Sequence, residues 1–238
     1  MGDLYMVGTP IGNLGDISLR ALETLKAVDV VACEDTRHTL GLLNHFSIKK
    51  PLVSCHANDE ERGSLRILKL LGEGKKVAYC SDAGTPGISD PGARAARRAR
   101  AAGHRVIPIP GPSALAALAS VAGFAERGFL FDGFLSPKGA RRRARLAELL
   151  AREEAFLLYE SPFRICRLAA DLAELAPERR VCLGRELTKL HEQIVDCTAG
   201  ELASRLAEGS DDPIPQKGEF AILVSGRAGK QGGEVEER

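Results

Sequence analysis

The sequence predicts an α/β protein made of two α/β domains. Through the first 113 residues, short apolar runs alternate with amphipathic helical segments, a pattern typical of a mainly parallel sheet with helices on both faces. Between residues 113 and 125 this pattern changes, and a stretch follows in which glycines alternate with phenylalanines. We therefore expect an N-terminal domain over residues 1–115, a C-terminal domain over 116–226 and a disordered tail over 227–238.

The composition is that of a globular protein with a neutral charge balance. Of the 238 residues, 44% are hydrophobic and the formal net charge is +1, so a nucleic-acid surface would have to come from a local patch. The six cysteines form no C-x-x-C pair, which argues against a disulfide framework or a zinc site. The N-terminal residues lack the features of a signal peptide, and the apolar run over 113–124 is too short to span a bilayer. We expect a soluble, cytoplasmic protein.

The first half of the chain is expected to hold the parallel sheet. Leucines recur at helical spacing after Ser18, a residue type that favours the N-cap of a helix. In the helix expected over 61–72, Leu65, Leu68 and Leu71 lie on one side. The expected strands are 4–7, 28–33, 51–55, 77–80 and 105–109, and further helices are expected up to 43, over 93–102 and from 114.

The second half is expected to form a smaller α/β unit with some antiparallel pairing. Its strands are short, and helical segments separate most of them, while a loop over 186–192 joins two of the strands directly. The expected strands are 155–160, 180–185, 193–197 and 219–225. One helix is expected to end at residue 150, and two others are expected over 165–175 and 199–208.

One stretch organises the first half. The buried strand over 77–80 runs into a loop over 81–92 that is rich in Gly and Pro, and a helix follows. In open α/β sheets such a loop is the usual place for a ligand, and Asp82 is suited to accept hydrogen bonds from a ribose or an amine. The alternative is an ordinary turn in which Ser89 or Asp90 caps the following helix.

Several other strands end in loops of the same kind. Loops at the carboxyl edge of parallel strands converge on one crevice. The loop over 34–38 gathers Glu34, Asp35 and Arg37 into a polar cluster, although Asp35 or Thr36 is also placed to cap a helix. No P-loop, G-x-G-x-x-G or H-E-x-x-H motif is present, and the histidines are scattered, so no nucleotide-triphosphate or metal site is expected. The remaining loops are 8–16, 110–113, 160–164 and 185–192.

Together these loops resemble the motifs of the tetrapyrrole (corrin/porphyrin) methylase superfamily. The segments that carry the resemblance are 4–16, 33–37, 81–92, 110–114, 159–164, 185–189 and 218–220. Within the superfamily the chain is similar to the branch that methylates the ribose 2′-hydroxyl of a cytidine in the decoding region of 16S ribosomal RNA. The resemblance implies two α/β domains with the active-site cleft between them, S-adenosyl-L-methionine as methyl donor, and a homodimer.

The resemblance also implies which residues bind the methyl donor. The carboxylate of Asp82 suits the ribose or the ammonium group of the donor, and the small residues Ser113 and Ala114 let a ring lie flat on a helix start. The implied cofactor-binding residues are Pro10, Ile11, Asp82, Ala83, Gly84, Thr85, Ser113, Ala114, Tyr159, Glu219 and Phe220.

The reaction needs alignment of three atoms and removal of one proton. The candidate catalytic residues are Lys189, Glu186, Glu34, Asp35 and Arg37. We expect Lys189 to be held charged by a carboxylate and to orient the hydroxyl, while Glu34 or Glu186 accepts the proton. The alternative is that Glu186, Lys189 and Glu192 form a surface ion-pair ladder.

A basic run and an aromatic stretch suggest partners. The run contains Lys138, Arg141, Arg142, Arg143 and Arg145, which we expect to face rRNA, although such runs are often only a solvated helix face. The four phenylalanines over 124–134 suggest a dimer surface, or they fill the core. Two other functions stay open: a methylase of small tetrapyrroles, whose propionates the basic run would hold, and a binding module without catalysis.

Overall fold

The computed structural model describes residues 1–56, 59–125 and 128–227, which form two compact units, Met1–Ala114 and Leu115–Arg238. The boundary between the units falls one residue before the boundary expected from the sequence. The expected tail lies outside the described residues apart from Arg227. Within the part of the chain that is described, no helix is both long and apolar enough to cross a membrane.

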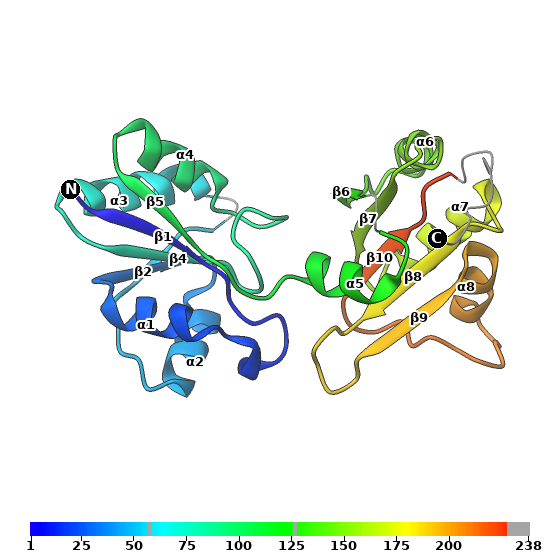
Figure 1. The fold of residues 1–238 in the computed structure, drawn as a ribbon, viewed down its shortest axis with the longest axis horizontal. Helices are drawn as coiled ribbons and strands as arrows, with labels where there is room; N and C mark the ends of the chain where they lie inside the picture. The colour runs from blue at the N-terminus through cyan, green and yellow to red at the C-terminus, as the bar shows by residue number, and fades with distance from the viewer. Residues whose placement is uncertain (57–58, 126–127, 228–238) are drawn as a thin grey trace, which may run out of the picture. The chain divides into compact units, whose positions relative to one another are not determined.

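The first unit is built on a five-stranded sheet in which every pair of neighbours is parallel (Figure 1). The strand order is β3-β2-β4-β1-β5, so β4 and β1 lie at the centre. Because the strands are parallel, all their carboxyl ends lie at one edge of the sheet. The strands are β1 (Asp3–Val7), β2 (Val30–Cys33), β3 (Leu52–Ser54), β4 (Val77–Cys80) and β5 (Arg105–Ile109).

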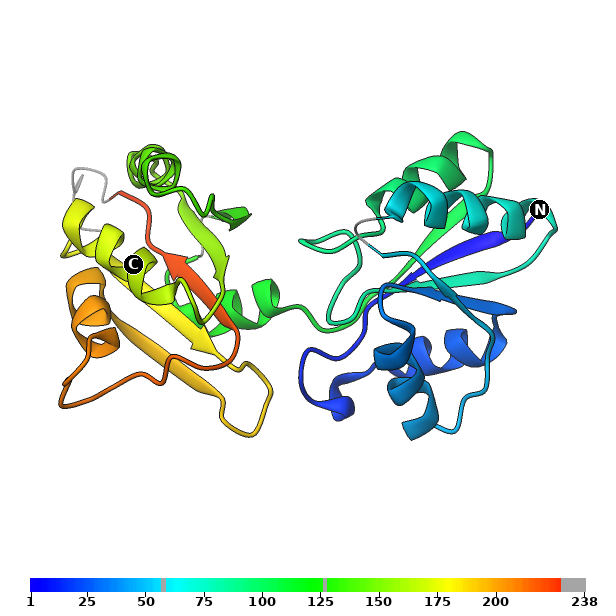
Figure 2. The ribbon, with the colours of Figure 1, turned by 180° about the vertical axis from the view of Figure 1, so that it is seen from behind.

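Helices cover both faces of this sheet, as the alternating pattern predicts. On one face, α1 (Leu19–Ala27) and α2 (Thr36–His45) bury residues such as Leu25 and Leu43. On the other face, α3 (Glu60–Gly72) and α4 (Ala93–Ala101) bury residues such as Ile67 and Ala99, and the two views of the ribbon show both layers (Figure 2). Ser18 caps α1 as predicted, because its Oγ accepts a hydrogen bond from the Ala21 N–H at 3.1 Å.

Helix α3 differs from the prediction in the face that it buries. Ile67 and Leu71 point into the core, whereas Leu65 is 50% exposed. Gly63 also lies on the buried face, where a Cβ atom would come within 2.4 Å of the Cys55 sulfur. The leucine repeat is therefore right for Leu71 and wrong for Leu65, because close packing of Gly63 against Cys55 turns another face of the helix to the core.

The second unit holds a mixed five-stranded sheet in the order β6-β7-β10-β8-β9. Strand β6 pairs with β7 in parallel, and the other three pairs are antiparallel, which confirms the mixed pairing expected. Strands β7 and β8 both run antiparallel to β10, so their carboxyl ends share one edge with that of β6. The strands are β6 (Phe129–Phe134), β7 (Ala155–Glu160), β8 (Arg180–Arg185), β9 (Gln193–Thr198) and β10 (Phe220–Val224).

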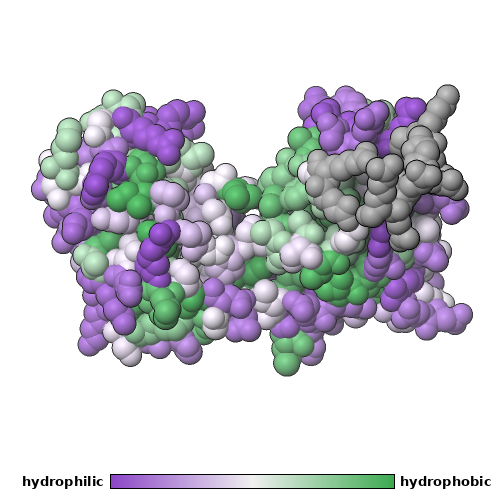
Figure 3. Space-filling view, in the orientation of Figure 1, coloured by the Kyte–Doolittle hydropathy of each residue, from purple (hydrophilic) through white to green (hydrophobic). Residues whose placement is uncertain are grey.

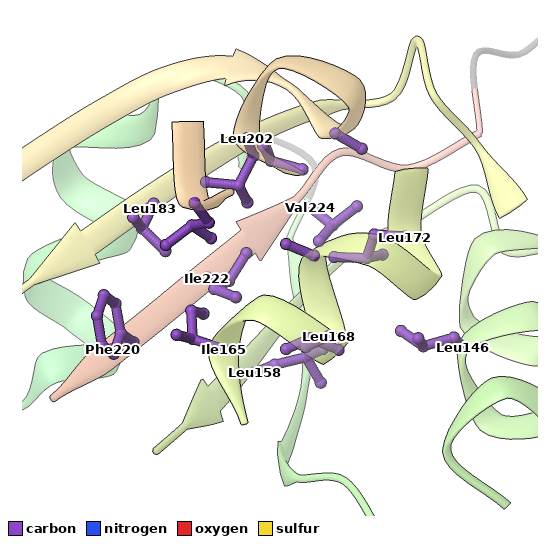
Figure 4. Close-up of a cluster of buried hydrophobic side chains, with 14 of the residues drawn as sticks. Leu146, Leu158, Ile165, Leu168, Leu172, Leu183, Leu202, Phe220, Ile222 and Val224 are labelled. Atoms are coloured by element: carbon purple, nitrogen blue, oxygen red, sulfur yellow. The ribbon is translucent and has the colours of Figure 1, made fainter. Parts of the chain in front are cut away.

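The main core of this unit lies between the sheet and three helices, α6 (Gly139–Leu150), α7 (Ile165–Leu175) and α8 (Ala199–Leu206). Leu158 and Ile222 point from the sheet toward Leu168 and Leu202 of the helices (Figure 4). Helix α5 (Ala114–Ala122) lies on the opposite face, where the Leu118 side chain approaches the backbone of Gly184. The second sheet therefore presents one face to its core and the other to α5.

Candidate functional site

In the first unit, the loops after β1 and β4 are joined by their backbones. The Thr9 N–H donates to the Gly84 carbonyl at 2.9 Å, and the Gly84 N–H donates to the Thr9 carbonyl at 3.1 Å. The Thr9 hydroxyl donates to the Ser81 carbonyl at 3.3 Å. Gly84 has a φ of +80°, a conformation that L side chains rarely adopt, and a Cβ atom there would lie 3.2 Å from the Ile11 side chain. The sequence-predicted residues Ile11 and Gly84 are therefore close neighbours.

The loop after β5 packs against the same pair of loops. A Cβ atom on Gly111 would lie 2.6 Å from the Gly8 carbonyl oxygen, so the two glycine backbones touch. The Thr85 hydroxyl donates to the Pro112 carbonyl at 3.3 Å. Three loops that are far apart in the sequence thus form one continuous surface, in which main-chain atoms make most of the contacts. Of the other predicted donor residues on this surface, Pro10, Asp82, Ser113 and Ala114 are half-buried and Ala83 is exposed.

The acidic cluster beside this surface is partly structural. Asp35 caps α2: its Oδ1 accepts from the Arg37 N–H at 2.8 Å, and its carboxylate pairs with the Arg37 guanidinium at 2.7 Å. These contacts hold the pKa of Asp35 well below its usual range, and the Arg37 side chain is 90% exposed. Asp82 accepts from the Asp35 N–H at 2.9 Å, which ties the loop after β4 to the start of α2.

Glu34 differs from Asp35 in its environment. Burial raises the pKa of the Glu34 carboxyl above its ordinary value, and the negative charges of Asp82 and Asp90 act in the same direction. A carboxyl with a raised pKa is a stronger proton acceptor once it is ionised. Of the three candidates in this cluster, Glu34 is the one suited to accept a proton.

The N-cap residue of α4 is neither Ser89 nor Asp90, so the ordinary-turn alternative for the loop over 81–92 is wrong on this point. Gly92 occupies the N-cap position with a φ of +128°. Glu60 of α3 takes over the capping: its Oε1 accepts from the N–H groups of Gly92 at 3.1 Å and Arg94 at 3.3 Å. The loop is therefore fixed at its far end by a neighbouring helix.

In the second unit, the loop after β8 places one lysine between two carboxylates. Lys189 Nζ lies 2.9 Å from Glu186 Oε1 and 3.0 Å from Glu219 Oε2. Glu186 Oε1 also accepts from the Glu219 N–H at 2.9 Å. Glu186 and Thr188 have φ values of +51° and +67°, so this turn holds two non-glycine residues in a left-handed conformation, a strain found mostly at functional sites.

The charges of this cluster stabilise one another. Burial acts to lower the pKa of Lys189, but the hydrogen bonds to Glu186 and Glu219 outweigh it and leave the pKa above its ordinary value. Burial acts to raise the pKa of Glu186, but the hydrogen bonds from Lys189 and the Glu219 backbone leave that pKa below its ordinary value. Lys189 is thus held charged, as expected, and Glu186 is a weak proton acceptor. The predicted ladder is wrong for Glu192, whose carboxylate accepts from the Thr188 N–H at 2.6 Å instead.

The other predicted donor residues of this unit differ in what they present. The half-buried Tyr159 ring meets the rings of Phe131 and Phe134 edge to face, with centroids 5.0 and 5.8 Å apart. The Glu219 side chain is 75% exposed. The prediction that the Phe220 side chain lines the donor site is wrong. This side chain is 3% exposed and belongs to the core shown in Figure 4, so only its backbone can line a site.

The basic run does not form the continuous patch that the sequence suggested. The Arg142 guanidinium is buried and pairs with Asp171 at 2.7 Å. Arg143 pairs with Asp171 and Glu174, and Arg145 pairs with Asp132 and Glu148. Lys138 and Arg141 are exposed, and within the described ranges they join none of the ion pairs. The RNA-facing prediction therefore reduces to these two residues, because the carboxylates of α7 and β6 neutralise the other three.

Two buried charged residues were missed at the edge of the second sheet. The Glu160 side chain is 1% exposed, accepts from the Ser161 N–H at 2.8 Å and pairs with Arg164 at 2.6 Å. Arg185 is 8% exposed and donates to three backbone carbonyls of neighbouring loops. For Glu160, a charged residue at the end of an otherwise apolar strand is the signal that would have identified it.

Comparison with known proteins agrees with this geometry. The family model of the tetrapyrrole (corrin/porphyrin) methylases matches residues 3–203. Proteins named "Ribosomal RNA small subunit methyltransferase I" are similar along almost the whole chain. The one from Xylella fastidiosa is 45% identical over 99% of this chain and 86% of its own length, and the one from Thermotoga maritima is 43% identical over 95% and 100%.

Solved structures share the fold at lower identity. The crystal structure of uroporphyrin-III-C-methyltransferase from Thermus thermophilus matches with a TM-score of 0.65 at 23% identity, over 94% of both chains. That of the methyltransferase CobJ matches with a TM-score of 0.68 at 18% identity, over 98% of both chains. At these identities the likeness concerns the fold alone. With a family model that covers most of the chain and relatives above 40% identity, the chain belongs to the tetrapyrrole (corrin/porphyrin) methylase family.

Proposed function

We propose that this protein transfers a methyl group from S-adenosyl-L-methionine to the 2′-hydroxyl of a cytidine ribose in the decoding region of 16S rRNA. The observation that carries the proposal is the 43–45% identity, over nearly full length, to proteins named for methylation of small-subunit ribosomal RNA. The loops that carry the sequence resemblance are also the loops that the structure brings to one edge of each sheet. We place the protein in the cytoplasm, where its substrate is assembled.

The backbone surface of the first unit fits a flat, positively charged donor. Around Gly84 and Gly111 a Cβ atom would be strained or would collide with neighbouring backbone, so the glycines let the three loops pack tightly into the surface on which we place the donor. Asp82 adds a carboxylate with acceptor capacity beyond its bond to the Asp35 N–H, which suits a ribose or an ammonium group. The donor would supply an electrophilic methyl group, and Pro10, Ile11, Ala83, Thr85, Ser113 and Ala114 of this unit would complete the surface that holds it.

The remaining chemistry belongs to this chain's own side chains. Lys189, held charged by Glu186 and Glu219, has N–H bonds suited to orient the ribose hydroxyl or an adjoining phosphate. Glu34 is the preferred proton acceptor because its pKa is raised, whereas that of Glu186 is lowered. Asp35 and Arg37 position the start of α2 beside Glu34.

We place the homodimer interface on the face of the second sheet that carries α5. Val121, Phe134 and Ile194 are 56%, 54% and 40% exposed on this face, and the space-filling view shows hydrophobic surface over α5 (Figure 3). A second copy of the chain would cover these apolar side chains in the proposed dimer. Sedimentation at micromolar concentration tests the interface, and a single 25.5 kDa species would refute it.

The deciding experiment offers the purified protein three substrates with radiolabelled donor: small ribosomal subunits, free 16S rRNA and a tetrapyrrole. We expect label in RNA, mapped to one cytidine by primer extension at low dNTP on rRNA from a deletion strain and from wild type. Label in the tetrapyrrole alone would establish the small-molecule alternative. Donor binding without transfer to any substrate would indicate a binding module.

Asp82→Ala and Asp82→Asn separate charge from positioning at the donor surface. The alanine variant loses both the charge and the acceptor for the Asp35 N–H, so we expect donor binding to be lost or strongly weakened. The asparagine variant keeps an acceptor, and we expect an intermediate affinity in a calorimetric titration. Wild-type affinity in the alanine variant would remove Asp82 from the donor site.

A further inference from the structure

Two apolar side chains project into solvent from one edge of the second sheet. Phe163, in the turn between β7 and α7, is 91% exposed, and Leu190, in the loop between β8 and β9, is 93% exposed. A hydrophobic protrusion is visible at the tip of the β8–β9 loop (Figure 3). Strands β7 and β8 both run antiparallel to the β10 strand between them, so the two loops stand at the same edge.

The turn that carries Phe163 is held by buried charge. Glu160 accepts from the Ser161 N–H, and its carboxylate pairs with Arg164 at 2.6 Å. Arg164 also donates to the Ser161 hydroxyl at 3.3 Å and to the Leu135 carbonyl at 3.3 Å, which ties the turn to the end of β6. The Phe163 ring is therefore presented outward by an ordered scaffold rather than by a loose loop.

The loop that carries Leu190 is held in the same way. Arg185, itself buried, donates to the His191 carbonyl at 3.1 Å, next to Leu190. Lys189, on the other side, is fixed by Glu186 and Glu219. An ordered loop that points an apolar side chain into water gains nothing from that side chain within the chain itself, because burial is what stabilises it.

We propose that Phe163 and Leu190 contact unpaired bases of the substrate RNA that flank the nucleotide to be methylated, with Phe163 stacking on one base. The inference rests on the proposed function, because this edge also carries Lys189, Glu219 and Tyr159. Single exposed apolar residues are ordinary on a protein surface. Here, however, both stand at the sheet edge where the reaction is placed.

The spacing favours RNA over a protein partner. Loops from strands two positions apart stand roughly 10 Å from each other, and the Lys217–Glu219 segment that leads into β10 lies between them. A protein interface needs a continuous apolar centre, whereas unpaired bases stack one at a time on separate aromatic side chains. Lys217 and Lys138 are exposed on neighbouring loops of this edge and suit phosphates, while Glu192 and Glu219 keep the local charge low. Stacking should therefore carry a larger share of the affinity than phosphate contacts.

The test compares Phe163→Ala with Phe163→Tyr, Leu190→Ser and a matched control, Leu19→Ala, whose side chain is 79% exposed on α1 of the first unit. Binding of small-subunit RNA is measured by fluorescence anisotropy at several salt concentrations. We expect Phe163→Ala to weaken binding roughly 5- to 100-fold and Leu190→Ser to weaken it less, while the tyrosine variant and the Leu19 control stay near wild type. The slope of log affinity against log salt should not change, because no phosphate contact is removed.

Further readouts separate this inference from the proposed function. Donor affinity and kcat at saturating RNA should be unchanged in Phe163→Ala, with the loss confined to KM. The inference fails if wild-type protein methylates RNA but Phe163→Ala and Leu190→Ser bind it normally, or if their loss follows dissociation of the oligomer in sedimentation. If the wild-type protein neither binds nor methylates RNA, the proposed function fails first. Since both side chains are exposed, unchanged thermal melts should accompany every variant.

Discussion

The loops at the site-bearing edges of the two sheets are held in place by different kinds of interaction. In the first unit, main-chain hydrogen bonds such as those between Thr9 and Gly84, together with glycine contacts, join three loops. In the second unit, charged side chains such as Lys189 and Arg164 hold the loops in place. At Gly111 an added atom would meet backbone, whereas at Lys189 a lost charge would remove the cation that pairs with Glu186 and Glu219. The expected responses to mutation differ accordingly.

The largest effect on the first unit should come from a single added methyl group, which forces apart the loops that form the donor surface. In Gly111→Ala the new Cβ would meet the Gly8 carbonyl oxygen at 2.6 Å, so the loops after β1 and β5 have to separate. We expect donor binding to fall below detection in calorimetry and the thermal stability to drop. Gly41→Ala is the control, since no atom lies within 4 Å of its Cβ position in α2, and it should be stabilising by about 0.5–1 kcal/mol. Normal donor affinity in Gly111→Ala would show that the loops adapt.

The second edge should fail through lost charge. Lys189→Ala removes the cation between Glu186 and Glu219. We expect single-turnover methyl transfer to fall by about 10²-fold or more with donor affinity retained, and Lys189→Arg to rescue it poorly, because a planar guanidinium does not replace a compact ammonium. Wild-type turnover in the alanine variant would remove Lys189 from the mechanism and leave the cluster over 34–37 as the leading candidate.

The proton acceptor gives a prediction that depends on pH. The groups that act on Glu34 are Asp35, Asp82, Asp90 and His56, and the net effect, led by burial, raises its pKa. The folded state therefore disfavours the ionised form, so the wild type is destabilised above the raised pKa and not below the ordinary value of 4.5.

Glu34→Gln should consequently gain stability relative to wild type at neutral pH and lose that advantage in acid. The same variant should lose about 10²–10⁴-fold in transfer rate, and the wild-type rate should fall as the pH drops through the raised pKa. Urea melts and single-turnover rates across pH 4–8 measure both effects. A Glu34→Gln enzyme that is fully active would assign the acceptor role elsewhere.

Within the basic run, substitution of an arginine by alanine should reduce the stability strongly at one position and hardly at its neighbour. Arg142→Ala removes one ion-pair partner of the buried Asp171 carboxylate and leaves it the half-buried Arg143, and we expect a loss of about 3 kcal/mol in stability. Arg141→Ala should change stability by less than about 0.5 kcal/mol, because its side chain is exposed.

The smallest expected effect is on RNA binding. Lys138→Ala with Arg141→Ala should weaken RNA affinity modestly and reduce the salt slope by up to about 2, one for each lost phosphate contact. Salt titrations of RNA affinity measure this effect. Chemical denaturation compares the stabilities of the Arg142 and Arg141 variants. Equal stabilities of the Arg142 and Arg141 variants would contradict the buried pair.

Local patterns in the sequence were sufficient for most elements. The limits expected for the strand over 155–160 and the helix over 165–175 agree with Ala155–Glu160 and Ile165–Leu175. Hydrophobic periodicity acts over a few residues, so it can be read without knowing the rest of the fold. The caps at Ser18 and Asp35 were also accessible, because an N-cap bonds to amides only two or three residues away. The motifs and their order along the chain indicated which loops carry function and which family the chain resembles.

Contacts between distant segments were decided only by the tertiary structure. Glu60 caps a helix that begins at Ala93, and Glu219 completes the ion pairs of Lys189. In the sequence Arg142 is one cation of a basic run, but in the structure its guanidinium is buried in an ion pair with Asp171. Which charges are buried and which face solvent depends on packing between helices and strands that are remote in the chain. The sequence by itself therefore determined the elements, their order and the loops that matter, whereas the fold determined which side chains in those loops are free to act.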